Sequence, residues 1–106
     1  MKVIVLGSSG IIGQHMRLCV PAGIAPAWHR CGMDEMSISA DLTNDEERGN
    51  LLKIIKPDVI VNLAGESNTD EVENAPDAAY QINVVVPQRL AEWCDKSGAH
   101  LIHISS

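Results

Sequence analysis

The chain has 106 residues, of which 45% are hydrophobic and 21% are charged, and its formal net charge is -6 at pH 7. This length suits a single domain, and this balance of residues argues against a disordered chain. The negative charge argues against nucleic acid as a partner, and no apolar run approaches the ~18 residues that a membrane span needs. The 3 cysteines are widely spaced without a Cys-x-x-Cys pair, which favours a reduced, cytoplasmic setting over a disulfide framework or a zinc site.

The hydrophobic pattern alternates between short β-branched runs, typical of buried strands, and longer stretches with helical spacing. The expected elements, in chain order, are strand 2–6, helix 11–20, strand 24–28, strand 36–40, helix 44–55, strand 59–63, helix 74–96 and strand 100–104. Such alternation implies an α/β fold in which a doubly wound parallel sheet carries helices on both faces.

Local signals predict where the two longer helices begin. Thr43 and Glu46 have the spacing of a capping box, and Asn74 is the expected cap of the last helix. Pro87 lies inside that last helix and should bend it. The inner side of the helix over 44–55 is expected to carry Leu51, Leu52, Ile54 and Ile55.

A Gly-x-x-Gly-x-x-Gly loop follows the first strand directly and leads into the first helix. Its residues are Gly7, Ser8, Ser9, Gly10, Ile11, Ile12 and Gly13. Gly7 permits the tight turn, Gly10 lets a pyrophosphate approach the backbone, and Gly13 lets the helix pack close to the sheet. The N–H groups of the helix N-terminus, with the Ser8 and Ser9 hydroxyls, can donate to the diphosphate. The motif predicts a dinucleotide site in a Rossmann-type sheet; the alternative is a structural strand–helix turn.

The end of the second strand selects the cofactor in this kind of site, where an acidic residue binds the ribose of NAD. Residues 28–31 contain no acid, whereas Arg30 could pair with a 2′-phosphate. We therefore expect NADP(H) or NAD(H) as the cofactor, with NADP(H) slightly preferred. The alternative for Arg30 is a solvated surface arginine.

Five segments carry a resemblance to a known family: residues 7–13, 40–43, 56–65, 70–83 and 101–106. On these, the chain resembles the N-terminal part of an extended short-chain dehydrogenase/reductase. It is most similar to the dTDP-4-dehydrorhamnose reductase family, which also contains the regulatory β subunit of methionine adenosyltransferase. The resemblance implies an NAD(P)-binding Rossmann domain over 1–106, truncated after the fifth strand and lacking a substrate domain. We expect the chain to be a fragment of a larger protein.

The resemblance also implies roles for single residues. Asp41 would accept a hydrogen bond from the adenine amine, and Leu42 would pack on the ring. Ala64 and Gly65 would let the ribose and phosphates pass close to the backbone. Asn83 would tie the long helix to the loop after the fourth strand. The alternatives are a helix-flanking acid for Asp41 and a purely structural role for Asn83.

Ser106 matches the catalytic Ser or Thr of the family, whose hydroxyl donates to the substrate carbonyl. The partner of that residue in the family is the Tyr of a Tyr-x-x-x-Lys motif. The single tyrosine of this chain is Tyr80, and Val84 stands where the lysine would be. The chain should therefore hold the cofactor without reducing a sugar by itself.

These features predict the cofactor-binding portion of an NAD(P)-dependent sugar-nucleotide reductase. The substrate of the complete protein would be a nucleotide-sugar, and no metal is expected. The alternatives are a non-catalytic NADP-binding regulatory module, like the methionine adenosyltransferase β subunit, and a nucleotide-sugar epimerase or dehydratase. The last strand would leave an unpaired edge, so we expect a homodimer through residues 101–104 if the chain folds alone.

Other polar and sulfur-bearing residues have less specific interpretations. His103 is expected to be a packed, hydrogen-bonded histidine rather than a ligand. Cys19 and Cys94 lie on apolar helical faces and are expected in the core. Cys31 lies in a loop near the expected cofactor region and is the one candidate for a reactive thiol; the alternative, which the sequence favours, is an unreactive thiol. The acidic loop over 66–73 is expected to be a solvated face.

Overall fold

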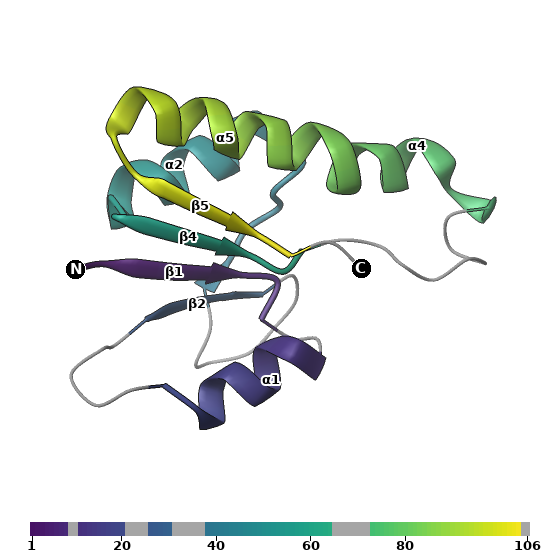
Figure 1. The fold of residues 1–106 in the computed structure, drawn as a ribbon. Coiled ribbons are helices and arrows are strands. Elements are labelled where there is room, and N and C mark those ends of the chain that lie inside the picture. Colours follow the sequence, from purple (N-terminus) through teal and green to yellow (C-terminus); the bar gives the residue numbers. More distant parts are fainter. Residues whose placement is uncertain (9–10, 21–25, 31–37, 65–72, 105–106) are drawn as a thin grey trace.

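The computed structural model describes residues 1–8, 11–20, 26–30, 38–64 and 73–104. A 5-stranded parallel sheet forms its centre, and the parallel pairing agrees with the sequence prediction; the strand order is β3-β2-β1-β4-β5. Its strands are β1 (Val3–Leu6), β2 (Ala27–Arg30), β3 (Ile38–Ser39), β4 (Val59–Asn62) and β5 (His100–His103). Helix α1 (Ile11–Leu18) lies on one face of the sheet, and helices α2 (Asp45–Ile55) and α5 (Val86–Ser97) lie on the other (Figure 1). This is the doubly wound, Rossmann-type arrangement.

The helical elements are α1 (Ile11–Leu18), α2 (Asp45–Ile55), α4 (Pro76–Tyr80), the π-helical segment η1 (Gln81–Val85) and α5 (Val86–Ser97). The main core lies between the sheet and the pair α2 and α5. Its buried members are Ile4, Leu6, Leu42, Leu51, Leu52, Ile60, Val86, Leu90 and Cys94. Alternate residues of a strand point to opposite faces, so Ile4 and Leu6 serve this core while Val3 and Val5 face α1.

The second strand lies further along the chain than the sequence predicts. It was expected over 24–28, whereas β2 spans Ala27–Arg30 and Pro26 precedes it. Residues 24 and 25 lie outside the described part of the chain. Proline has no N–H to donate to a strand ladder, so the pairing with β1 begins at Ala27, opposite Ile4.

The cap of α2 is Asn44, so the predicted capping box on Thr43 is wrong. The side-chain Oδ1 of Asn44 accepts from the N–H groups of Glu46 and Glu47, each at 3.0 Å. The Thr43 hydroxyl donates instead to the Asp41 carboxylate at 2.6 Å. The helix therefore starts one residue later than a Thr43 cap would place it.

Two apolar residues that were expected inside are exposed. Ile54 is 77% exposed, because Leu51 and Leu52 already define the inner stripe of α2 and Ile54 falls outside it. Cys19 follows the end of α1 and is exposed, whereas Cys94 is buried as predicted. Burial raises the pKa of the Cys94 thiol.

The predicted long helix is interrupted near Pro87. Asn74 does not cap it: the N-cap of α4 is Ala75, which makes no side-chain cap bond. The N–H of Val86 bonds to the carbonyl of Gln81, five residues back, which closes the π-helical segment. Pro87 has no N–H to continue the ordinary ladder, so the break comes where the sequence predicts a bend.

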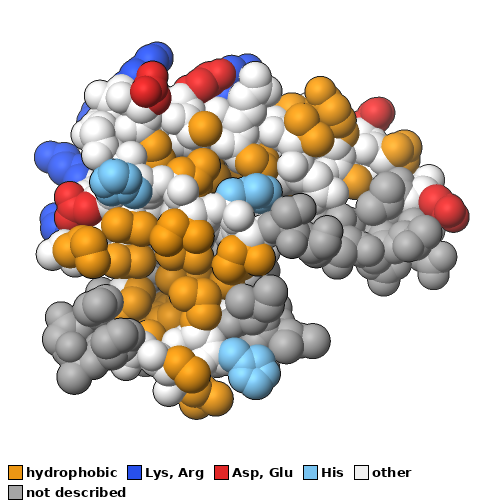
Figure 2. Space-filling view, in the orientation of Figure 1, with side chains coloured by type: hydrophobic (Ala, Val, Ile, Leu, Met, Phe, Trp, Pro, Cys, Tyr) orange, Lys and Arg blue, Asp and Glu red, His pale blue; other side chains and the backbone are white. Residues whose placement is uncertain are grey.

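An apolar surface lies on the face of the sheet that α1 only partly covers. The register places Val3 and Val5 beside Val59 and Val61, with Ile102 beside Val61. Figure 2 shows hydrophobic side chains gathered over β1, β4 and β5, between α1 and α5. Ile102 is 51% exposed. In the ranges that the structure describes, no helix is both long and apolar enough to cross a membrane.

Candidate functional site

The candidate site lies at the carboxyl edge of the sheet, where β1 turns toward α1. Gly7 has a φ of +70°, and a Cβ at this position would lie 2.6 Å from the backbone nitrogen of Ala64. The Leu63 N–H donates to the Leu6 carbonyl at 2.9 Å, which holds the two strand ends together. Only glycine tolerates both the positive φ and the close approach to Ala64, so the tight turn predicted at Gly7 is confirmed.

Gly13 brings α1 against the end of β1. A Cβ on Gly13 would lie 2.4 Å from the Ser8 carbonyl oxygen, so the close packing predicted for this glycine is confirmed. Ile11 and Ile12 open α1, and the first turn of this helix carries no acidic residue. The positive end of the helix dipole therefore faces the loop without an acidic side chain in that turn. Ser9 and Gly10 lie outside the described residues.

Ser8 is enclosed rather than free for a ligand. It is 1% exposed, and its hydroxyl donates to the His29 carbonyl at 2.9 Å. The Ser8 N–H donates to the same carbonyl at 2.8 Å. The Ser8 hydroxyl, which was expected to donate to a diphosphate, therefore donates to the backbone of β2 in this structure.

His29 is a buried histidine that sequence reasoning missed as part of the site. The Gly7 N–H lies 3.2 Å from its Nδ1, and its Nε2 lies 2.8 Å from the Ala40 carbonyl oxygen. Burial lowers the pKa of His29, opposed by the bond to Ala40. The sequence carried only a weak signal, a titratable side chain directly after the strand expected over 24–28.

Asp41 and Leu42 follow β3 and differ in exposure. Asp41 is exposed, and its Oδ1 accepts from the Thr43 hydroxyl and from the Thr43 N–H at 2.9 Å. These bonds lower the pKa of Asp41. Leu42 is 2% exposed and packs in the main core, so its side chain has no surface to offer an adenine ring. The predicted stacking role of Leu42 is wrong because the core takes this side chain.

Asn62 organises the loop after β4, and sequence reasoning assigned it no role. This fully buried side chain accepts from the Ala64 N–H at 3.1 Å and lies 3.1 Å from Nδ1 of His103. The backbone carbonyl of Asn62 accepts from the Ile104 N–H at 3.1 Å. One residue thus links the ends of β4 and β5. His103 is hydrogen-bonded as predicted but exposed rather than packed.

The remaining predicted residues are less fully described. Arg30 ends β2, and its side chain lies outside the described part. Asn83 is exposed within η1, and π-helical segments are frequent at functional sites. Gly65 and Ser106 lie outside the described residues, as do Cys31 and residues 66–72 of the acidic loop. Among the residues that are described, no cluster of His, Cys, Asp or Glu could hold a metal ion.

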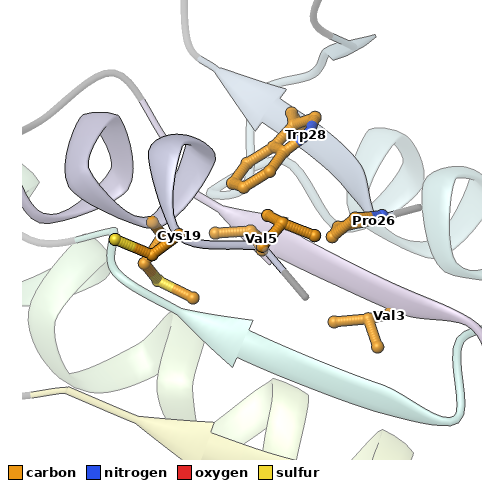
Figure 3. A pocket seen from close by; sticks show the side chains of 7 residues that line it. Val3, Val5, Cys19, Pro26 and Trp28 are labelled. Carbon is orange, nitrogen blue, oxygen red and sulfur yellow. The ribbon is translucent and has the colours of Figure 1, made fainter. Parts of the chain in front are cut away.

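A separate cavity of about 200 Å³ lies between α1 and the sheet. Figure 3 shows Val3, Val5, Cys19, Pro26 and Trp28 around it. Met16 and Val20 complete its lining. Apolar walls do not suit a diphosphate, because they cannot replace the hydration of its charges. The carboxyl edge is therefore the better candidate for an anionic ligand.

This fold and this edge define a Rossmann-type α/β protein with a glycine loop between its first strand and first helix. Residues 1–106 match the family model described as the RmlD substrate binding domain, and the chain belongs to this family.

Relatives of two kinds match the whole chain. It is 29% identical over 108 residues to dTDP-4-dehydrorhamnose reductase from Escherichia coli, covering 100% of this chain and 35% of that protein. It is 34% identical over 110 residues to methionine adenosyltransferase 2 subunit beta from Rattus norvegicus, covering 99% and 32%. The chain thus spans about a third of the length of the curated relatives it matches.

Solved structures confirm the fold. A hypothetical dTDP-4-dehydrorhamnose reductase from Sulfolobus tokodaii superposes with a TM-score of 0.88 at 22% identity, covering 99% of this chain and 39% of that one. The dTDP-4-dehydrorhamnose reductase of Bacillus anthracis, solved in complex with NADP, gives 0.76 at 24% identity, covering 98% and 35%. UDP-glucose 4-epimerase from Thermus thermophilus, solved with NAD, gives 0.80 at 22% identity, covering 95% and 36%.

Proposed function

We propose that this chain is the cofactor-binding portion of an NAD(P)-dependent sugar-nucleotide reductase. The observation that carries the proposal is the Gly7 turn, where a positive φ and the 2.6 Å approach to Ala64 hold the start of the glycine loop at the carboxyl edge of the sheet. Ligands of open α/β sheets bind at this edge. The names of the reductase relatives and the NADP bound to the Bacillus anthracis protein agree with it.

Each described residue of the edge has a part in binding. Gly7 and Gly13 keep the loop close to the sheet, so that the first N–H groups of α1 can receive the diphosphate. Asp41 is a carboxylate at neutral pH, as an aspartate ordinarily is, and its bonds to Thr43 lower its pKa further, so it can accept from the adenine amine. The bound cofactor would supply the hydride, while the protein supplies position and electrostatics.

The cofactor is NADP(H) or NAD(H), with a preference for NADP(H) that we assign to Arg30. A guanidinium at the end of β2 would pair with a 2′-phosphate by charge-assisted hydrogen bonds. Titration with NADPH and NADH, followed by nicotinamide fluorescence, should show tighter binding of NADPH. Arg30→Ala should remove the difference, whereas the control Arg89→Ala on the exposed side of α5 should keep it. Equal affinities in the unmodified chain would contradict the preference.

The complete protein should reduce a nucleotide-sugar, and the 106-residue chain alone should not. Ser106 would donate to the substrate carbonyl, but this sequence has no Tyr-x-x-x-Lys motif to supply the proton. NADPH oxidation with dTDP-4-dehydrorhamnose should occur with the full-length parent protein and be absent with this chain. Turnover by this chain would contradict the proposal that it binds the cofactor without reducing the sugar by itself. Absence of turnover by the parent protein would contradict the reductase assignment.

A second candidate is a non-catalytic regulatory module. The 34% identity to methionine adenosyltransferase 2 subunit beta favours it, since this exceeds the 29% identity to the Escherichia coli reductase. In that case the parent protein should bind NADP(H), show no turnover, and co-purify with a methionine adenosyltransferase. Reductase turnover would exclude this candidate.

We also propose that the 106-residue chain by itself pairs with a second copy along β5, in a reduced cytoplasmic setting. Ile102 in β5 and Ile104 just after it are 51% and 39% exposed. The outer side of an edge strand such as β5 can template pairing with another chain. Sedimentation velocity should show a dimer that Ile102→Lys dissociates. The control Ile54→Lys, on the exposed side of α2, should leave it intact. A monomer at high concentration would contradict the pairing.

A further inference from the structure

We infer that His29 is the positioning residue of the proposed dinucleotide site, and that its ring sets the glycine loop against the segment that carries Asp41. This inference rests on the proposed cofactor binding. His29 touches no ligand in this account and acts through Gly7 and Ala40.

The hydrogen bonds of the ring define its state. A backbone N–H can only donate, so Nδ1, which lies 3.2 Å from the Gly7 nitrogen, must present a lone pair. A carbonyl oxygen can only accept, so Nε2, which lies 2.8 Å from the Ala40 oxygen, must carry the proton. His29 is therefore neutral in its Nε2–H tautomer. Its 1% exposure and lowered pKa agree with this state.

The backbone of His29 holds the next residue of the loop as well. Its carbonyl accepts from the Ser8 N–H at 2.8 Å and from the Ser8 hydroxyl at 2.9 Å. One residue of β2 therefore makes three hydrogen bonds to the first two residues after β1. Because Ser8 is itself 1% exposed, solvent has little access to compete for its two bonds.

The ring joins two parts of the site that bind opposite ends of an adenosine diphosphate unit. Gly7 begins the loop proposed for the diphosphate, and Ala40 directly precedes Asp41, proposed for the adenine. A ring bonded to both keeps their separation fixed, and binding sites lose affinity when their groups shift by ~0.5 Å. Since His29 bonds to Gly7 after β1 and to Ala40 after β3 with different nitrogens, the two hydrogen bonds can be removed separately.

Two amide variants separate the two hydrogen bonds of the ring. In His29→Asn the amide oxygen can take the place of Nδ1 and accept from Gly7, while the bond to Ala40 is lost. In His29→Gln the amide nitrogen can take the place of Nε2 and donate to Ala40, while the Gly7 N–H loses its acceptor. His29→Leu removes both. Urea unfolding of each variant gives its stability independently of ligand.

The measured quantity is the dissociation constant for NADPH, with the tautomer read from long-range ¹⁵N–¹H NMR spectra of the ring. We expect His29→Leu to weaken binding by ~10-fold or more, the factor that corresponds to about 1.4 kcal/mol. His29→Asn and His29→Gln should each recover part of the loss, and the ring should be the neutral Nε2–H form at neutral pH.

Different results overturn different claims. If His29→Leu leaves the NADPH affinity unchanged, or if the affinities of the variants only follow their urea midpoints, then His29 is a core histidine without a positioning role. A ring protonated on Nδ1 at neutral pH would contradict the two hydrogen bonds directly, whether or not NADPH binds. Absence of NADPH binding by the unmodified chain would refute the proposed function, and the spectra would still test the hydrogen bonds of His29.

Discussion

Among the glycines that the structure describes, Gly7 is the one at which a left-handed φ and a close backbone contact both oppose alanine. The position carries two separate penalties, a φ of +70° and a Cβ only 2.6 Å from the Ala64 nitrogen. The chain offers a control for each: Gly98 has a φ of +79° with nothing near its Cβ, and Gly13 has only the close contact. Gly49 has neither, since nothing lies within 4 Å of its Cβ.

The expected magnitudes follow from these differences. Gly98→Ala should cost about 1–2 kcal/mol, because it places an L side chain in the left-handed region. Gly13→Ala should cost about 1–3 kcal/mol, because the backbone must move to admit a methyl group. Gly7→Ala combines both penalties and should lose about 2–5 kcal/mol. Gly49→Ala should instead stabilise α2 by about 1 kcal/mol, because alanine is the better helix former.

The assay is urea unfolding followed by far-UV circular dichroism, with the other variants made in the Gly49→Ala background so that they keep a folded baseline. The free energies of unfolding should fall in the order Gly49→Ala alone, Gly98→Ala, Gly7→Ala. NADPH affinity should fall in Gly7→Ala and stay unchanged in Gly98→Ala, which lies at the opposite end of the sheet from the loop. Equal destabilisation by Gly7→Ala and Gly98→Ala would refute the close approach to Ala64.

Three further predictions concern buried polar and sulfur groups. Asn62→Leu leaves the partly buried Ala64 N–H without its acceptor and should lower the free energy of unfolding by about 1–3 kcal/mol in urea; an unchanged midpoint would contradict the role of Asn62. Arg48→Met keeps the apolar stem but removes the donor to the Leu42 carbonyl, with a similar cost, and a stability equal to that of the unmodified chain would count against this bond. Cys94 should react with an aromatic disulfide reagent only upon unfolding, whereas exposed Cys19 should react at once; equal rates in the folded chain would contradict the burial of Cys94.

Regular periodicity predicted most of the fold. The strand over 59–63 and the helix over 44–55 were correct to within a residue, because their apolar residues meet one core and their ends carry strong local signals. The second strand was misplaced, because Pro26 weakens its pattern and its position depends on pairing with β1. Pairing between distant segments leaves no local signal in the sequence.

The candidate site was predicted only in part. The errors concern side chains whose surroundings are determined by the fold rather than by neighbouring residues in the sequence. Gly7 and Gly13 were identified because glycine is the only residue that permits such backbone contacts. Leu42 was assigned to a ligand, although the core encloses it. His29 and Asn62 were missed, because their importance comes from hydrogen bonds to strands far away along the chain. A motif reveals the residues that make room for a ligand, whereas those that position them emerge only from the fold.

The central claim is that a dinucleotide binds along the carboxyl edge of the sheet. The measurement that tests it most directly is a titration of the ¹⁵N-labelled 106-residue chain with NADPH, followed by amide chemical shifts. We predict saturable shifts that concentrate at Gly7, Gly13, Asp41 and Ala64. Absence of shifts, or shifts confined to the apolar cavity beside Trp28, would contradict the claim.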